Sequence, residues 1–336
     1  MTMLRISFAE MHEQFQAVLQ RLGFEREKAE LCARIFAENS LDGVYSHGVN
    51  RFPRFVEYIR KGHIHVQAEP RKVSGMGNLE QWDGQLGPGP LNAMQAAGRS
   101  MKLAAANGLG LVALANTNHW MRGGTYGWHC AKQGFAFIGW TNTIANLPGW
   151  GARESKLGNN PLVIGIPYGS EAIVLDMAMS QYSYGKMEDL AGRGGKLPQP
   201  GGFSQAGEMT TDPAEILQTG RALPIGYWKG AGLSLMLDLL ATILSAGLST
   251  SAINKQGGDE YGVSQVFIAI DLKSLSNYPL IEKTLQQILS DYLSATPVDG
   301  NTEIRYPGQQ VLKTREENLL LGIPVSPIVW EKVCQL

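Results

Sequence analysis

The sequence predicts an α/β protein of the α+β kind, in which a helical part accompanies a mixed β-sheet. Two observations carry this prediction. The first sixty residues space their apolar side chains as amphipathic helices do, and the middle of the chain holds five short apolar runs bounded by Gly, Pro or Asn, as strands are. Helical stretches are interleaved irregularly with these runs, which favours a mixed sheet over a regular parallel one. The five runs are 110–115, 135–140, 161–166, 172–176 and 266–270.

Helices are predicted before and after these strands in the sequence. Ser7 and Glu10 have the spacing of a capping box, and the helix that they start ends at Gly23. A second helix is predicted over 25–41, and the last fifty residues return to helical spacing.

The length and composition indicate a two-domain globular protein. With 336 residues, we expect a mainly helical domain from 1–75 with 288–336 and a mixed-sheet domain from 76–287. Lys and Arg number 29 and Asp and Glu 30, which gives a net charge of −1. A charge this small does not favour a nucleic acid or a membrane surface as a partner. The 3 Cys argue against a disulfide framework. With no apolar signal segment in view, we expect a cytoplasmic protein.

The stretch 231–248 is almost uniformly apolar and is close in length to a membrane-spanning helix. Asp238 lies in its middle and Lys229 just before it, and a charge at bilayer depth is costly. We therefore expect a helix buried in the protein core.

Common nucleotide and metal motifs do not fit this sequence. Gly108 and Gly110 lie between a helix and a strand, the reverse of the Rossmann order, and the third glycine is missing. The glycines of 192–196 lack the spacing and the Ser or Thr of a P-loop. His63 and His65 have no carboxylate or Cys nearby in the sequence, so we expect no metal site.

One short segment sets Ser46, His47 and Arg51 within six residues. If it forms a turn of helix, His47 and Arg51 share a face. Histidine suits proton transfer near neutral pH, and the arginine fork binds a carboxylate at two points. Ser46 is suited to cap the helix or to contact a substrate. Taken alone, a capped surface helix with incidental His and Arg explains the segment more simply.

A second polar group, over 116–124, directly follows a buried strand and contains His119 and Arg122. Side chains at the end of such a strand commonly form α/β binding sites. A polar loop with a satisfied histidine is the simpler interpretation. The two His and Arg groups together favour a small, anionic, oxygen-rich substrate.

Eight sequence blocks, in order along almost the whole chain, make the sequence resemble the malate/L-lactate dehydrogenase family, whose members lack a Rossmann fold. The resemblance implies a helical domain, a mixed, largely antiparallel nucleotide-binding sheet and a homodimer. The blocks are Tyr45–Phe55, Glu80–Asp83, Asn118–Gly124, Trp140–Asn142, Asn160–Leu162, Asp176–Gly185, Gly226–Gly232 and Asp259–Ile270.

The same resemblance assigns roles to the two polar groups. His47 matches the family's proton donor, and His119 matches a second active-site histidine, so which imidazole performs the acid–base step stays open. Arg51 matches the residue that holds the substrate carboxylate, and Ser46 matches a neighbouring polar contact.

The implied cofactor is NADH, with NADPH less favoured. Gln309 and Gln310 replace a more charged pair, which leaves this choice open. Asp176 is suited to bind a ribose or to cap a turn, and Lys229 to pair with a pyrophosphate or to lie on the surface. The positions that match the family's nucleotide contacts are Ala172, Ile173, Val174, Leu175, Asp176, Met177, Ala178, Trp228, Lys229, Gly308, Gln309 and Gln310.

Trp120, Met121 and Arg122 stand where relatives acting on malate or lactate carry Gly-rich residues, which indicates a longer, polyhydroxylated substrate bound in part by Arg122. We therefore expect NADH-dependent reduction of a six-carbon diketo sugar acid. The alternatives are a dehydrogenase for malate, lactate or a cyclic imino acid, and a catalytically silent nucleotide- or sugar-acid-binding module. The intact pair of His47 and His119 argues against the silent module.

Overall fold

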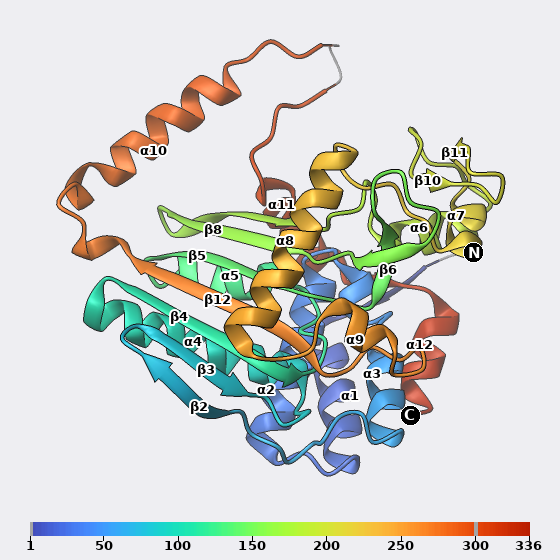
Figure 1. The fold of residues 1–336 in the computed structure, drawn as a ribbon, viewed down its shortest axis with the longest axis horizontal. Helices are drawn as coiled ribbons and strands as arrows, with labels where there is room; N and C mark the ends of the chain where they lie inside the picture. The colour runs from blue at the N-terminus through green and yellow to red at the C-terminus, as the bar shows by residue number, and fades with distance from the viewer. Residues whose placement is uncertain (1–2, 299–301) are drawn as a thin grey trace.

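A seven-stranded sheet forms the centre of the computed structural model, which describes residues 3–298 and 302–336 (Figure 1). β3 and β4 pair in parallel, and the other neighbouring strands pair antiparallel. The predicted mixed sheet is confirmed, and the five predicted strands are β4, β12, β5, β8 and β9. In sheet order the strands are β2 (Arg71–Met76), β3 (Leu79–Asp83), β4 (Leu109–Thr117), β12 (Val263–Asp271), β5 (Phe135–Thr141), β8 (Leu162–Tyr168) and β9 (Glu171–Met177).

Helices cover both faces of this sheet, which explains why its strands are continuous apolar runs. Val112 of β4 packs on one face with α4 and α5, and its neighbour Ala113 packs on the other face with α8. Figure 1 shows α8 crossing the near face, with α4 and α5 behind the sheet. These helices are α4 (Gly89–Asn107), α5 (Gly124–Ala131) and α8 (Trp228–Ser245).

The helical part has a separate core of aromatic side chains. The ring of Phe15 stacks on that of Phe52 at 4.1 Å, and Phe36 meets Phe52 edge-on at 5.1 Å. Ser7 caps the first helix as predicted, by accepting the Glu10 N–H. The elements of this part are β1 (Leu4–Ile6), α1 (Phe8–Arg21), α2 (Arg26–Leu41), α3 (Phe52–Arg60), β13 (Ile323–Val325) and α12 (Pro327–Cys334).

The remaining elements are short, except for two helices near the carboxyl end. In Figure 1, α10 extends away from the body of the protein, and α11 returns to it. The sheet begins with β2 at residue 71, and the domain borders given above stay a prediction. The elements are η1 (Tyr45–His47), β6 (Ala145–Pro148), β7 (Ser155–Gly158), α6 (Tyr184–Gly192), β10 (Gly202–Phe203), β11 (Met209–Thr210), α7 (Pro213–Thr219), α9 (Thr250–Asn254), η2 (Leu272–Ser274), α10 (Tyr278–Leu293) and α11 (Gln309–Leu321).

The expectation that 231–248 is wholly buried is wrong. α8 buries one face, on which Asp238 accepts hydrogen bonds from Asn142 Nδ2 and the Thr250 N–H. Its opposite face is apolar and exposed, with Ile243 at 69%. The other exposed apolar residues on this face are Leu233, Leu235, Met236, Leu239 and Leu240. Within the described ranges, no helix is both long and apolar enough to cross a membrane.

Phe15→Ala is expected to destabilise the protein by about 3–5 kcal/mol, because it removes a fully buried ring and leaves a cavity between α1, α2 and α3. Gln20→Ala on the exposed side of the same helix is the matched control, with an expected change within about 0.5 kcal/mol. Urea unfolding measures both. Similar losses in the two variants would show that the aromatic core does not stabilise this part.

Candidate active site

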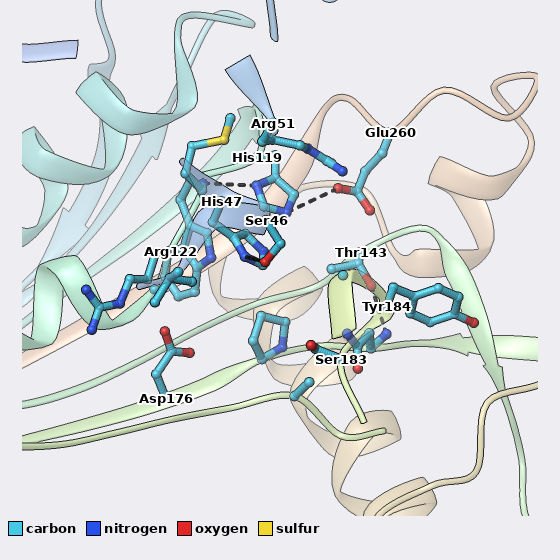
Figure 2. Close-up of a pocket in the computed structure, with 18 of the residues that line it drawn as sticks. Ser46, His47, Arg51, His119, Arg122, Thr143, Asp176, Ser183, Tyr184 and Glu260 are labelled. Carbon is cyan, nitrogen blue, oxygen red and sulfur yellow. Dashed lines mark hydrogen bonds and ion pairs between the residues drawn. The ribbon is translucent and has the colours of Figure 1, made fainter. Parts of the chain in front are cut away.

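A cavity of about 580 Å³ opens between the helical part and the sheet (Figure 2). Its volume is in the range of sites that bind small molecules and cofactors. The segment from η1 to α3 places His47 and Arg51 on its wall, and the segment after β4 adds His119 and Arg122. The two polar groups that the sequence singled out therefore meet in one cavity.

The turn that carries His47 is held against the end of α2. Val49 donates its N–H to Ser40 Oγ at 2.8 Å, and Asn39 Nδ2 donates to the His47 carbonyl at 3.0 Å. Gly48 lies so close that a Cβ there would be 2.1 Å from Ser40 Oγ. Glycine is required at position 48 by this close approach of two chain segments.

The segment 46–51 does not form the single turn of helix in which His47 and Arg51 would share a face. His47 ends the 3₁₀ turn η1, whereas Arg51 is the N-cap of α3. Ser46 caps neither helix, and its Oγ lies 3.1 Å from His47 Nδ1. His47 and Arg51 still line the same cavity because the turn between them reverses the chain.

The two histidines stack, with ring centroids 5.6 Å apart and 24° between their planes. His119 Nδ1 accepts the Met121 N–H at 2.9 Å, so the neutral ring carries its proton on Nε2. That Nε2 lies 3.9 Å from Glu260 Oε1. The bond from Met121 thus holds His119 in one tautomer, with a donor directed into the cavity.

Burial and neighbouring cations keep both rings neutral at pH 7. Desolvation, followed by the charges of Arg51 and Arg122, lowers the pKa of His47 to about 4. Desolvation, followed by Arg51 and His47, lowers the pKa of His119 well below its usual value. An anion bound at Arg51 would offset part of the charge that lowers both pKa values and would favour protonation.

Arg122 is buried, as are Trp120 and Met121, so the segment is shielded from solvent. Its guanidinium is ion-paired with Asp42 at the end of α2. Arg122 thus lines the cavity while it joins the segment after β4 to the helical part.

Strand β9 contributes alternate residues to the cavity, as the pleat of a strand requires. Val174, Asp176 and Ala178 line it. Asp176 Oδ2 accepts the Gly124 N–H at 2.7 Å, so it caps the start of α5, and its pKa is raised by desolvation. The other positions of the predicted segment do not line the cavity: Ala172, Ile173, Leu175 and Met177.

The two remaining predicted nucleotide segments are placed differently. Gly308 lines the cavity, while the side chain of Gln309 accepts the Tyr306 N–H and that of Gln310 contacts Thr314. Trp228 and Lys229 are exposed at the start of α8 and lie outside the cavity of their own chain.

The cavity wall fits a nicotinamide ring. Gly308 has a φ of +92°, and a Cβ there would lie 3.2 Å from the Val174 backbone N. The chain at Gly308 therefore packs directly on β9, and the small apolar residues Val174, Ala178 and Gly308 all line the cavity. A flat ring fits against such a wall, with the two imidazoles on the same cavity.

Sequence reasoning did not single out several cavity residues. Arg54 and Glu260 had a signal, because both lie inside the resemblance blocks and carry charge. Ser183 and Tyr184 lie inside the block Asp176–Gly185 but carry no charge, and Thr143 lies outside every block. Only the fold brings these two segments to one place.

The sequence profile of the malate/L-lactate dehydrogenase family matches residues 6–334. The chain belongs to this family. Family members are oxidoreductases that act on 2-hydroxy and 2-oxo acids, so the resemblance inferred from the sequence is confirmed. The 2,3-diketo-L-gulonate reductases of Klebsiella pneumoniae (strain 342) and Citrobacter koseri are each 45% identical to it over 332 residues, which cover 98% of this chain and 99% of each relative.

Solved structures share the fold. Malate dehydrogenase from Entamoeba histolytica superposes with a TM-score of 0.94 at 22% identity, covering 99% of this chain and 97% of that one. Sulfolactate dehydrogenase from Methanocaldococcus jannaschii gives a TM-score of 0.88 at 26% identity, covering 98% and 95%. These dehydrogenases have the helical part and the mixed sheet in common with the present chain.

Gly185→Ala is expected to slow dehydrogenase turnover and to cost about 1–3 kcal/mol of stability, because its Cβ would lie 2.4 Å from Ser46 Cβ and push the turn that carries His47. Gly192→Ala at the other end of α6 is the matched control, since nothing lies within 4 Å of its Cβ. Oxidation of a reduced nicotinamide coenzyme by a 2-oxo acid measures turnover, and urea unfolding measures stability, in both variants. If Gly185→Ala behaves like Gly192→Ala, the contact with Ser46 does not position His47.

Proposed function

We propose that this protein reduces 2,3-diketo-L-gulonate to 3-dehydro-L-gulonate with NADH. The observation that carries the proposal is the 45% identity to 2,3-diketo-L-gulonate reductases over nearly the full length of both chains. The cavity supports it with two imidazoles and three arginines among its lining residues, which suits a carboxylate next to a ketone.

In this proposal Arg51 binds the substrate carboxylate through its planar fork. The bound anion offsets the charge that lowers the pKa of His47, so the pKa of His47 rises when the substrate enters. Substrate binding therefore prepares the proton donor.

The hydrogen bonds of the two rings favour His47 over His119 as the donor. The partner of His47 Nδ1 is the Ser46 hydroxyl, which donates or accepts by rotating, so His47 gains and loses a proton without losing this bond. The partner of His119 is the Met121 N–H, which only donates, so a second proton on His119 breaks that bond. His119 then serves as a neutral donor to the developing oxyanion.

NADH, when bound, supplies the hydride. Val174, Ala178 and Gly308 would hold the nicotinamide by packing, and Asp176 lies beside them on β9. NADH is proposed over NADPH, with a titration of both coenzymes as the direct test.

A panel of 2-oxo acids tests the reaction. NADH oxidation is expected to be fastest with 2,3-diketo-L-gulonate, and His47→Gln is expected to lower kcat by about 10²–10⁴-fold while leaving NADH affinity near its original value. His65→Gln, exposed and outside the cavity, is the matched control. Faster turnover of the oxo acid that corresponds to malate or lactate, or of a cyclic imino acid, would show that 2,3-diketo-L-gulonate is not the preferred substrate. Binding of NADH without turnover of any acid would favour a silent module.

We also propose a homodimer. The exposed apolar face of α8 and the extended α10, with Leu280 and Ile288 each 59% exposed, leave apolar surface that a second copy would cover. Trp228 and Lys229 lie at the start of α8, outside their own cavity, and a second copy packed here would bring them toward another chain's cofactor. This arrangement accounts for their match to the family's nucleotide contacts.

Ile243→Glu is expected to convert the dimer to a monomer, because it buries a charge in the proposed apolar interface. Lys102→Glu introduces the same carboxylate on the exposed side of α4 and serves as the control. Light scattering after gel filtration gives the mass of each. A wild-type monomer, or a dimer that persists in Ile243→Glu, would contradict the proposed interface.

A further inference from the structure

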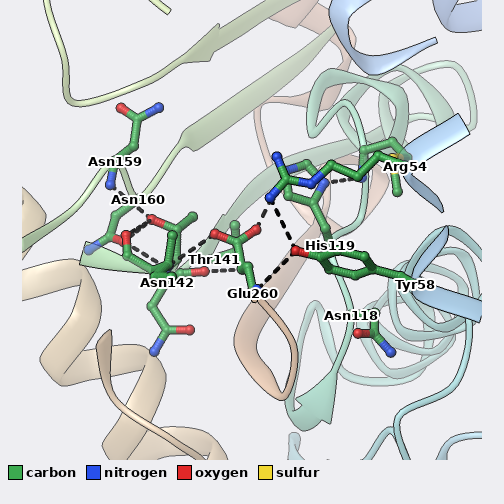
Figure 3. A network of polar contacts seen from close by, with 12 residues as sticks. Arg54, Tyr58, Asn118, His119, Thr141, Asn142, Asn159, Asn160 and Glu260 are labelled. Carbon is green, nitrogen blue, oxygen red and sulfur yellow. Dashed lines mark hydrogen bonds and ion pairs between the residues drawn. The ribbon is translucent and has the colours of Figure 1, made fainter. Parts of the chain in front are cut away.

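Glu260 is the buried carboxylate at the imidazole end of the cavity, on the loop between α9 and β12 (Figure 3). Its Oε2 accepts the Ile144 N–H at 3.0 Å, and its own N–H donates to the Tyr58 hydroxyl at 3.1 Å. Its Oε1 lies 3.9 Å from His119 Nε2. Hydrogen bonds thus hold both the backbone and the carboxylate of Glu260, and the carboxylate lines the cavity.

The same tyrosine hydroxyl links Glu260 to an arginine. Arg54 Nη2 donates to Tyr58 Oη at 3.2 Å, so Arg54 and Glu260 contact one oxygen. Arg54 lies on the first turn of α3, three residues after Arg51, and both line the cavity. The cavity therefore offers two guanidinium groups to an incoming anion.

The charges at this end are balanced before any substrate enters. Arg51 and Arg54 are the cations, and Glu260 and Glu188 are the carboxylates. Glu188 is exposed on α6, where water screens it, whereas Glu260 is 7% exposed and is screened little. One substrate carboxylate binds Arg51. A second would have to approach Arg54 next to the fixed charge of Glu260.

We propose that Glu260 restricts the substrate to monocarboxylates, by occupying the field of Arg54 and repelling a second carboxylate. Discrimination of this kind depends on a repulsive group built against the wrong ligand. The inference rests on the proposed function, since it refines which 2-oxo acids the same cavity accepts.

Calorimetric titration of the full-length protein with L-lactate and with L-malate, each in the presence of NADH, tests the proposal, because a hydroxy acid cannot accept hydride and therefore only binds. The two ligands differ by one carboxylate. Glu260→Gln is expected to improve the affinity for malate relative to lactate by about tenfold, because it removes the charge of a buried carboxylate whose repulsion the solvent around the exposed Arg54 screens only in part. Glu260→Asp keeps the charge and is expected to keep the wild-type ratio. Glu57→Gln, an exposed carboxylate on α3 outside the cavity, is the matched control.

A double variant identifies the cation that Glu260 occupies. Adding Arg54→Gln to Glu260→Gln is expected to abolish the gain for malate. Glu260→Ala provides a second neutral replacement if Glu260→Gln fails to fold, as thermal unfolding would show. An unchanged ratio in folded Glu260→Gln or Glu260→Ala, or an equal change in both affinities, overturns the proposal. Because the titration needs no turnover, a failure of 2,3-diketo-L-gulonate reduction is a separate result.

Discussion

The carboxylate of Asp42 joins three parts of the chain around the cavity, which are α2, the segment after β4 and α11. It lies at the end of α2 and is ion-paired with Arg122 from the segment after β4 and with Arg315 of α11, the latter at 2.7 Å. Charges that leave water are stable only when such partners satisfy them. His119 lies three residues before Arg122 in the chain, so its position depends on the packing of the helical part on the sheet.

Close contacts between glycine and serine define the other side of the cavity. Gly48 lies against Ser40, and Gly185 lies against Ser46, each with no space for a Cβ. The turn bearing His47 is thus packed between α2, through Ser40, and α6, through Gly185. Such contacts position an imidazole without charge, so its protonation stays sensitive to the ligand that enters.

The electrostatics of the cavity suit a reaction in which the histidine that donates the proton becomes protonated when the substrate binds. Two neutral imidazoles stand among arginines that disfavour their protonation, and the bound carboxylate reverses this effect. The fixed carboxylate of Glu260, which lies beside His119, limits how much further negative charge the same space accepts. Binding, proton donation and substrate choice thus depend on the same few charges.

The sequence by itself determined the strands, the main helices and the two His and Arg groups, because apolar periodicity and local motifs act over a few residues. It indicated Arg54 and Glu260 only as charged members of matching blocks. The tertiary structure decided that His47 and Arg51 lie in different helices, that Asp176 caps α5 and that Arg122 pairs with Asp42. It also decided that α8 exposes an apolar face. Each of these depends on contacts between residues far apart in the chain, which no local pattern encodes.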